Sequence, residues 1–448
     1  MQRQPHDAFA VPQPLSRRGF LRRSAAATAA TALAGAAVPY VHAAGGASLK
    51  IGLVGCGGRG TGAAQQALST KEPVQLWAMA DVLADRLEAS LASLVEGKDL
   101  RRKTPAGASV AGRIDVPPER RFTGFDAYEK LIQSGVDVVL LATPPHFRPI
   151  HYEYAVAQGK HVFMEKPLAV DAPGVRTLLA ANEVAKKKKL KVGVGFQRHH
   201  QAVYLETIPR IKDGAIGELL FLRCYWNGSG SDLPPRAGQS EMEYQIRNWY
   251  RFPWLSGDHI VEQHCHNLDV ANWILGEHPI EAQGMGGRQW RRLSGSYDHH
   301  AVEFTYPGGV KLFSYCRQIP GCWNQVAEFA HGAKGTADVS KGSIEAGSSS
   351  WRFRGSKANP YQVEHDDLFR AILDDKPYFE ADYGAMSTMT AVLGRMATYS
   401  GQRVTWDTAF ASPLRLAPER YALDADPPVL PDAHGAYVTA IPGVTKAW

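Results

Sequence analysis

Residues 49–60, LKIGLVGCGGRG, are a short apolar run that leads directly into a glycine-rich turn. A continuous apolar run bounded by a turn predicts a buried strand. The Ala-rich segment that follows, through Leu68, predicts a helix. A strand, a glycine turn and a helix in this order are typical of the first unit of a parallel, doubly wound sheet.

The next part of the chain repeats this alternation. Further buried strands are expected at 74–80, 137–143 and 160–165, and helices at 85–95 and 151–158. Alternating strands and helices predict an α/β domain with a parallel sheet. We place this domain at residues 45–168.

The pattern changes after Lys191, where strands are expected without a helix between each pair. The expected strands are 219–226, 281–285, 300–305 and 310–315, and the expected helices are 263–275 and 382–400. This part predicts a second, α+β domain at residues 169–411, with a large open and mostly antiparallel sheet. The Pro- and Ala-rich tail, residues 412–448, is expected to be an arm lying on the domain or on a partner subunit.

The glycines predict a dinucleotide site. Gly55, Gly57 and Gly60 fit the spacing G-x-G-x-x-G, in which the glycines allow a tight turn, close approach of a pyrophosphate, and close packing of helix on strand. Gly58 and Arg59 lie within the same turn. Asp81 ends the second strand, where a carboxylate accepts hydrogen bonds from ribose hydroxyls and repels a 2′-phosphate. The sequence therefore predicts NAD as cofactor.

The first 44 residues have the pattern of an export signal. Ser16-Arg17-Arg18-Gly19-Phe20-Leu21-Arg22 is a twin-arginine sequence, and a weakly apolar stretch and small residues near Ala43 follow it. That stretch is shorter than the ~20 residues that a membrane span needs. The twin-arginine export machinery carries folded proteins, so we expect a periplasmic or other extracytoplasmic protein, with no membrane span in the mature chain.

Composition excludes several classes of protein. The 44% of hydrophobic residues excludes a wholly disordered chain. Most of the net charge of +6 lies in the leader, which carries five arginines and one aspartate, so charge gives no reason to expect nucleic acid. Five cysteines are too few and odd in number for a disulfide scaffold; only Cys316 and Cys322 are considered as a pair.

Several motifs in order carry a family resemblance. The glycine turn, Asp81, Thr143-Pro144, Glu165-Lys166-Pro167 and a later His266-x-x-Asp269 resemble the glucose–fructose oxidoreductase / inositol dehydrogenase / MocA family, over about residues 49–400. The resemblance implies a Rossmann domain followed by an open-sheet domain, oxidation or reduction of a secondary alcohol of a sugar or cyclitol, and a homo-oligomer.

The resemblance also implies roles for individual residues. Lys166 would be the catalytic lysine, His266 the acid/base and Asp269 a residue that orients the substrate or His266. An imidazole suits proton transfer because its unperturbed pKa of ~6.5 is close to operating pH. The remaining expected contacts are, on the cofactor, Thr143, Pro144, His146, Glu165 and Lys166, and on the substrate, Lys166, Arg198, Glu262, His264 and His266.

Two positions depart from the family pattern. His264 stands where a small residue is usual, and Arg148 stands where a histidine often follows Thr-Pro. With a histidine at position 264, Glu262, His264 and His266 lie close in sequence to His259. Such a set of side chains could bind zinc. Residues two apart on a helix do not share a face, so we expect no metal and local hydrogen bonding instead.

The expected location restricts the chemistry. An exported enzyme needs an NAD that is loaded before export, held tightly and regenerated in place. Oxidation of one sugar coupled to reduction of another carbonyl compound would meet this need. So would a redox-neutral glycosidase or lyase that passes through a transient 3-keto sugar. We favour the oxidoreductase; a non-catalytic NAD- and sugar-binding protein is the third alternative, which Lys166 with His266 disfavours.

Overall fold

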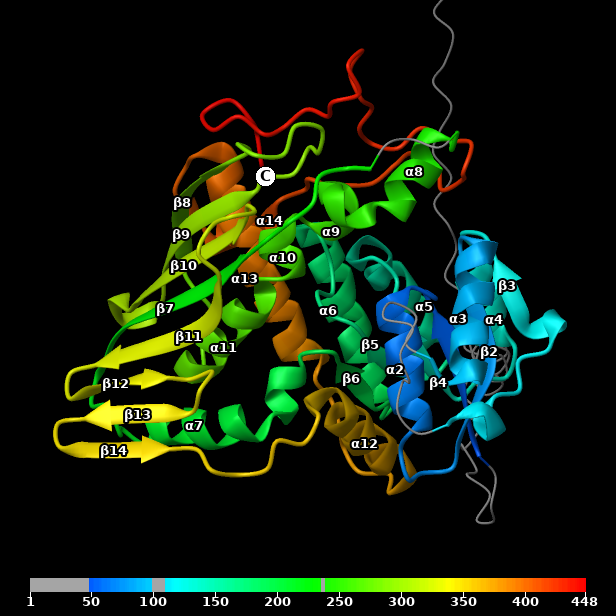
Figure 1. Cartoon of the computed structure of the whole chain (residues 1–448), viewed down its shortest axis with the longest axis horizontal. Coiled ribbons are helices and arrows are strands. Elements are labelled where there is room, and N and C mark those ends of the chain that lie inside the picture. The colour runs from blue at the N-terminus through cyan, green and yellow to red at the C-terminus, as the bar shows by residue number, and fades with distance from the viewer. Residues whose placement is uncertain (1–47, 99–108, 235–237) are drawn as a thin grey trace, which may run out of the picture. The chain divides into compact units, whose positions relative to one another are not determined.

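The computed structural model describes residues 48–98, 109–234 and 238–448. The expected export signal, residues 1–44, lies outside this part of the chain. Within it, the strands form two sheets (Figure 1). No helix in the described ranges is long and apolar enough to cross a membrane.

The first sheet has six parallel strands in the order β3-β2-β1-β4-β5-β6. The strands are β1 Leu49–Val54, β2 Val74–Asp81, β3 Arg121–Thr123, β4 Val138–Leu141, β5 His161–Met164 and β6 Val192–Val194. The helices that connect and cover them are α2 Gly58–Leu68, α3 Ala84–Glu96, α4 Ala127–Gln133, α5 Arg148–Ala157 and α6 Ala172–Lys187. This is the doubly wound sheet that the sequence predicts. The sheet extends past residue 168, the expected domain boundary, because β6 pairs with β5.

The second sheet has nine strands in the order β14-β13-β12-β11-β7-β10-β9-β8-β15. Its strands are β7 Leu219–Gly228, β8 Glu281–Gly287, β9 His299–Thr305, β10 Lys311–Gln318, β11 Gln325–Gly332, β12 Gly335–Asp338, β13 Ser343–Ala346, β14 Ser349–Arg352 and β15 Val404–Thr405. Only β7 and β10 pair in parallel, so the sheet is mostly antiparallel, as expected. The sequence missed β11 to β15, which extend the sheet at both edges.

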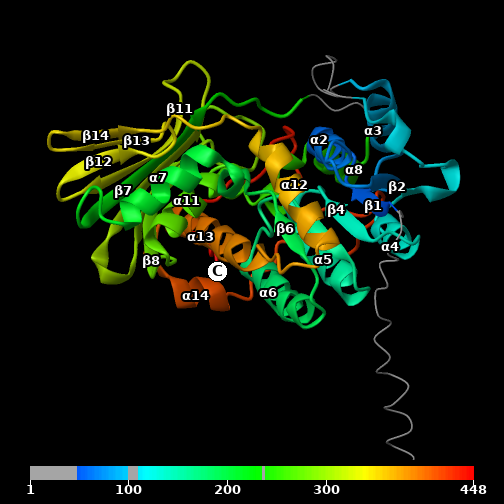
Figure 2. The ribbon, with the colours of Figure 1, turned by 90° about the horizontal axis from the view of Figure 1, so that it is seen from below.

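Helices cover one face of this sheet (Figure 2). The covering helices are α7 Ala202–Lys212, α11 Cys265–Leu275 and α13 Ala381–Ser400, with α14 Trp406–Ala411 at the edge. The remaining helices are α8 Glu241–Arg247, α9 Pro253–Ser256, α10 His259–Glu262 and α12 Pro360–Leu373. The expected helix 263–275 is shorter: α10 ends at Glu262 and α11 begins at Cys265. Alternate strand residues face α11 and α13, which gives the core its apolar contacts.

The tail after Ser412 packs on the same chain. Leu416 donates its backbone N–H to Asp171 at 2.8 Å, and Tyr421 bonds His146 at 2.8 Å. Tyr437 is buried and packs edge-on against Phe252. All five cysteines are free thiols, so Cys316 and Cys322 form no disulfide.

Candidate functional site

The glycine turn has the geometry of a phosphate cradle. Gly55 has a φ of +96°, and a Cβ on Gly60 would lie 1.8 Å from the carbonyl oxygen of Gly55. A Cβ on Gly57, in contrast, would meet nothing within 4 Å. Gly60 therefore fits α2 against the turn, whereas Gly57 leaves room for a ligand to approach the backbone at the start of the helix.

A cavity of about 310 Å³ opens in front of this turn. Gly55, Gly57, Gly58, Thr143 and Pro144 line it, as the sequence predicts for a cofactor site. It lies at the carboxyl ends of the parallel strands, where open α/β sheets bind ligands. The space in front of Gly57 and the surrounding wall therefore fit a dinucleotide.

Asp81 lies at the end of β2 and also lines the cavity. Its carboxylate accepts backbone hydrogen bonds from Cys56 at 2.6 Å and Leu83 at 2.9 Å. Burial raises the pKa of Asp81, although these hydrogen bonds and Arg86 oppose the shift. The acidic group is thus held at the edge of the turn, in the position expected for contact with a ribose.

The second domain supplies a wall of this cavity that the sequence did not reveal. Ile246, Arg247 and Trp249 line it from the segment around α8. Arg247 forms a bidentate ion pair with Asp85 of α3, at 2.9 and 3.0 Å. These residues are about 160 positions apart, so no local sequence pattern brings them together. The ion pair joins the two domains beside the cofactor cavity.

Lys166 and Glu262 form the centre of the expected catalytic site. Lys166 lies two residues after the end of β5. Its Nζ donates to the main-chain oxygen of Glu262 at 2.5 Å and to Glu262 Oε1 at 3.1 Å. Burial alone would lower the pKa of Lys166, but the carboxylates of Glu262 and Glu165 outweigh it and raise the pKa. Lys166 therefore carries a positive charge, and its contacts with Glu262 at the end of α10 fix the direction of its side chain.

His266 lies in the first turn of α11 and is 4% exposed. Its ring is parallel to Trp226, with centroids 5.8 Å apart, and edge-on to Phe196 at 5.7 Å. Burial, followed by the positive charges of Lys166 and Arg198, lowers its pKa well below 6.5. His266 is therefore a neutral imidazole near the lysine, with its Nδ1 unpaired among the described residues.

Asp269 is buried on the same helix, one turn from His266. Its Oδ2 pairs with Nε2 of His199 at 2.8 Å, and its Oδ1 accepts from the Ser387 hydroxyl at 2.7 Å. His199 is stacked between Trp273 and Tyr383, with both centroid distances 4.2 Å. Asp269 therefore contacts His199, which the sequence did not single out, rather than His266 directly.

Arg198 is held by the second sheet. It lies in a 3-10 turn at Gln197–His200 and forms a buried ion pair with Glu328 of β11. Glu328 also accepts from Tyr204 at 3.0 Å and from Asn267. The ion pair joins this turn to the sheet, and contact of Arg198 with substrate stays a prediction.

His264 contacts the second sheet. It is fully buried, and its Nε2 lies 2.7 Å from the Ser314 hydroxyl of β10 and 3.5 Å from Cys224 of β7. It lies at the junction between α10 and α11. These contacts pack the junction on the sheet, and contact of His264 with substrate stays a prediction.

Besides Gly60 and Lys166, three expected cofactor residues lie outside the cavity lining. Arg59 pairs with Glu165 at 2.6 Å and lies over the ring of Tyr361, so both charged groups face α12. His146 bonds Tyr421 of the C-terminal arm, and burial lowers its pKa to about 3. For Arg59, Glu165 and His146 the structure therefore shows support of the cofactor loops rather than a free binding surface.

Arg148, which stands where a histidine often follows Thr-Pro in the family, has a structural role. Its guanidinium is buried and donates to the main-chain oxygens of Pro167 and Thr143, both at 2.6 Å. The arginine thereby ties the loop after β4 to the loop after β5. It holds the cavity-lining Thr143 next to the segment that carries Lys166.

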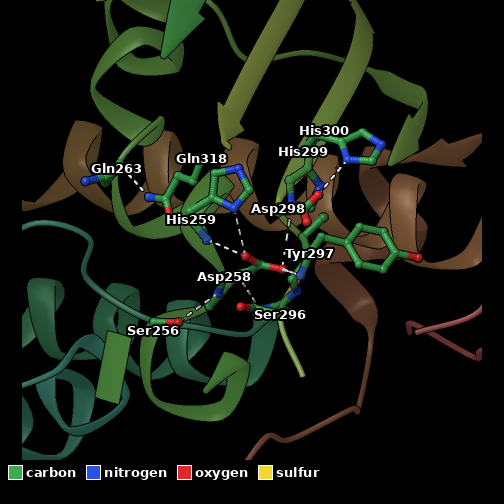
Figure 3. Close-up of polar contacts among 12 residues, drawn as sticks. Ser256, Asp258, His259, Gln263, Ser296, Tyr297, Asp298, His299, His300 and Gln318 are labelled. Atoms are coloured by element: carbon green, nitrogen blue, oxygen red, sulfur yellow. Dashed lines mark hydrogen bonds and ion pairs between the residues drawn. The ribbon is translucent and has the colours of Figure 1, made fainter. Parts of the chain in front are cut away.

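A second polar cluster lies immediately before α10 (Figure 3). Asp258, His259 and His300 are buried, and one ligand atom from each lies within 4.8 Å of the others. The Asp258 carboxylate already accepts from His259 N and Nδ1, from Tyr297 N at 2.8 Å and from Tyr399 OH at 2.5 Å. We assign this cluster to fixing the start of α10, the helix that ends at Glu262.

These features define a dinucleotide-binding α/β fold with a lysine just after β5, at the carboxyl edge of its parallel sheet. Residues 49–196 match the model of an oxidoreductase family with an NAD-binding Rossmann fold, and residues 205–359 match the C-terminal domain of the same family. The chain belongs to the GFO/IDH/MocA family, and NAD is its cofactor.

Similar proteins include inositol 2-dehydrogenases. That of Klebsiella pneumoniae (strain 342) is 30% identical over 233 residues, which are 51% of this chain and 55% of the relative. That of Pseudomonas fluorescens is 35% identical over 156 residues, 34% of this chain and 40% of the relative. The chain thus spans about half the length of the curated relatives it matches.

Solved structures share the fold. Aldose-aldose oxidoreductase from Caulobacter crescentus, complexed with glycerol, has a TM-score of 0.62 and 19% identity, covering 80% of this chain and 100% of that one. Scyllo-inositol dehydrogenase from Lactobacillus casei, with bound NAD(H) and scyllo-inositol, has a TM-score of 0.60 and 17% identity, covering 81% and 100%. At this identity the likeness concerns the fold.

Proposed function

We propose that the protein is an exported oxidoreductase that acts on a secondary hydroxyl of a sugar or glycoside with a tightly held NAD. The observation that carries the proposal is that Glu262 holds Lys166 just after β5, where its positive charge helps to lower the pKa of His266. Arg148 ties this loop to the cavity-lining Thr143. A cation and a neutral imidazole are the two groups that such a reaction needs around one hydroxyl. Relatives and fold neighbours named for sugar or inositol chemistry support the substrate class.

The two side chains divide the work. Bound NAD supplies the acceptor for the hydride that leaves the alcohol carbon. The unprotonated His266 accepts the hydroxyl proton, which its depressed pKa allows at neutral pH. The Lys166 ammonium donates to the same oxygen and stabilises the negative charge that develops there. Glu262 fixes Lys166 through both its carboxylate and its main-chain oxygen.

Export and cofactor retention belong to the same proposal. The twin-arginine sequence at Ser16–Arg22 implies transport of a folded protein, which requires NAD to be bound beforehand. The cavity receives walls from both domains, and the Arg247–Asp85 ion pair closes one side. These contacts oppose the release of NAD into a compartment without a free pool.

The open sheet supports self-association. The face opposite the helices carries an aromatic group in which Tyr225 stacks on Tyr315 at 5.5 Å and contacts Trp323 edge-on. Trp323 is 60% exposed and Tyr315 38%. Contiguous exposed apolar surface of this kind marks interaction sites. We therefore expect a homo-oligomer through this face, measurable by light scattering, and Trp323→Glu should shift it toward the monomer.

One experiment separates the chemical alternatives. The mature protein is purified from its export route, and the absorbance of reduced nicotinamide is followed while neutral sugars and aryl glycosides are added. Stable reduction supports a dehydrogenase that awaits a second substrate. Release of the aglycone without lasting reduction supports the redox-neutral glycosidase or lyase. The absence of bound nicotinamide contradicts cofactor retention and favours a non-catalytic protein.

A further inference from the structure

A second cavity, of about 500 Å³, adjoins the cofactor cavity, because Arg247 and Trp249 line both. Its lining residues come from the segment after β7 and from the end of α8: Ser231, Asp232, Pro234 and Arg247 to Arg251. Tyr250 links it to α10, because its hydroxyl accepts a hydrogen bond from Gln318, which also donates to Gln263, the residue after Glu262. The cavity is thus placed to receive a part of the substrate remote from the reacting hydroxyl.

Two arginines that are distant in sequence meet at Gln318, and one of them, Arg251, lines this cavity. Arg251 donates to Gln318 Oε1 at 3.0 Å and to the Ser231 hydroxyl at 2.8 Å. Arg291 donates to the same Gln318 oxygen, to the Ser296 hydroxyl at 3.0 Å and to the Tyr297 main-chain oxygen at 2.6 Å. All of these acceptors are neutral. Within the described ranges, no ion pair to a carboxylate forms at either guanidinium.

Buried charges are normally paired, because an isolated charge loses its hydration without compensation. Arg291 is 2% exposed. Burial and repulsion from Arg291 together lower the pKa of Arg251 to about 10, so Arg251 still carries its charge at neutral pH. The site therefore holds two neighbouring cations without a counter-ion in contact.

The one acid that lines the cavity is already engaged. Asp232 accepts backbone N–H groups from Leu233 at 2.9 Å and Arg292 at 2.7 Å, with longer bonds from Leu293 and Ser294 at 3.4 Å. These bonds keep its carboxylate on the loop of residues 292–294. Its charge reaches Arg251 only at longer range.

Gln318 links the arginines to the catalytic segment. Its Nε2 donates to Gln263 Oε1 at 2.6 Å and to Tyr250 OH at 2.9 Å, and Gln263 follows Glu262 directly (Figure 3). A ligand that contacts Arg251 would therefore be linked to Lys166 through Gln318, Gln263 and the adjoining Glu262. Sequence inspection finds no basic cluster in this domain, because Arg251 and Arg291 are separated by 40 positions and meet only in the fold.

We propose that this cavity binds an anionic group of the substrate, a carboxylate or a phosphate, against Arg251, with Arg291 reinforcing the positive charge from behind. Guanidinium groups suit both oxyanions because they present parallel N–H donors. The proposal rests on the proposed function and narrows its substrates to sugar acids, acidic glycosides or sugar phosphates.

Calorimetric binding to the full, NAD-loaded protein tests this proposal. The probes are methyl β-D-glucuronide, glucose 6-phosphate and methyl β-D-glucoside. We expect the wild type to bind one of the anionic probes at least ~tenfold more tightly than the neutral glucoside, in line with the ~1.5–3 kcal/mol of a charged hydrogen bond. The better anionic probe identifies carboxylate or phosphate as the group.

Variants assign the effect to Arg251. Arg251→Gln should bring the anionic and neutral probes within about twofold of each other, whereas Arg251→Lys, which keeps the charge, should retain part of the preference. Arg292→Gln, an exposed arginine on the adjacent loop, is the matched control and should retain all of it. Circular dichroism checks that each variant is folded.

Three results overturn the proposal: equal or weaker binding of both anionic probes than of the neutral glucoside, failure of both anionic probes to bind, or an unchanged preference in folded Arg251→Gln. A distinct result concerns the proposed function alone. If the anionic preference is present but no probe reduces the bound NAD or is cleaved, the anion site stands and the proposed oxidation is contradicted.

Discussion

Lys166→Met should remove most of the turnover while leaving the protein folded and NAD bound. An ammonium has three N–H donors. Two are directed at Glu262, at 2.5 and 3.1 Å, so one remains for the substrate oxygen. Removing one buried donor to a developing oxyanion costs about 2.7–4 kcal/mol, or ~10²–10³-fold in kcat. Methionine keeps the length and apolar stem of the lysine without its charge.

The assay compares kcat and NAD affinity in three variants. Lys191→Met is the matched control, because Lys191 is also buried and ion-paired, with Asp375, but lies outside the site. It should leave kcat unchanged. Lys166→Met/Glu262→Gln separates the lost donor from the effect of an unpaired Glu262. If folded Lys166→Met, with NAD still bound, turns over within about threefold of the wild type, the reasoning is refuted.

Three further predictions concern the cofactor and the proton. Gly60→Ala should lower the melting temperature, because its Cβ would lie 1.8 Å from a backbone oxygen, whereas Gly57→Ala should fold normally and bind NAD more weakly; the reverse order would contradict the cradle. The pKa of His266 is lowered, so the imidazole stays unprotonated as the pH falls and oxidation kcat/KM should remain level through pH 6.5. A loss with an inflection at or above 6.5 would contradict this. Arg247→Ala should weaken NAD retention by only ~1.5–5-fold, since an exposed ion pair contributes about 0.2–1 kcal/mol, and Asp85→Ala should match it in an off-rate measurement.

The parallel sheet and the glycine turn could be predicted because their signals are local. The predicted strands β1, β2, β4 and β5 are largely apolar runs, whereas the three-residue strands β3 and β6 were missed. Gly55, Gly57 and Gly60 occupy fixed positions within a few residues. Lys166 and His266 were predicted from motifs that follow one another in a fixed order along the chain. These features require no knowledge of which distant segments meet.

The omissions arose where a side chain's partner lies on another element. For Arg198 and His264 the sequence did not reveal the partners Glu328 and Ser314, which lie on two strands of the second sheet. Arg247 was missed for the same reason, since Asp85 lies in the other domain. The direction of a side chain at a helix junction depends on tertiary packing, which spacing alone does not contain.

The segment that walls the NAD cavity is itself held by the last part of the chain. Gln245 donates to the main-chain oxygen of Val429 at 2.7 Å, Ser240 to that of Leu423 at 2.5 Å, and Tyr437 bonds Glu241 at 2.6 Å. The ribosome makes these bracing residues after both domains, so the cofactor pocket is finished only once residues 423–437 have been synthesised. Tight binding of NAD therefore requires that the C-terminal arm has folded. A chain whose synthesis stalls before the arm would leave its NAD poorly enclosed.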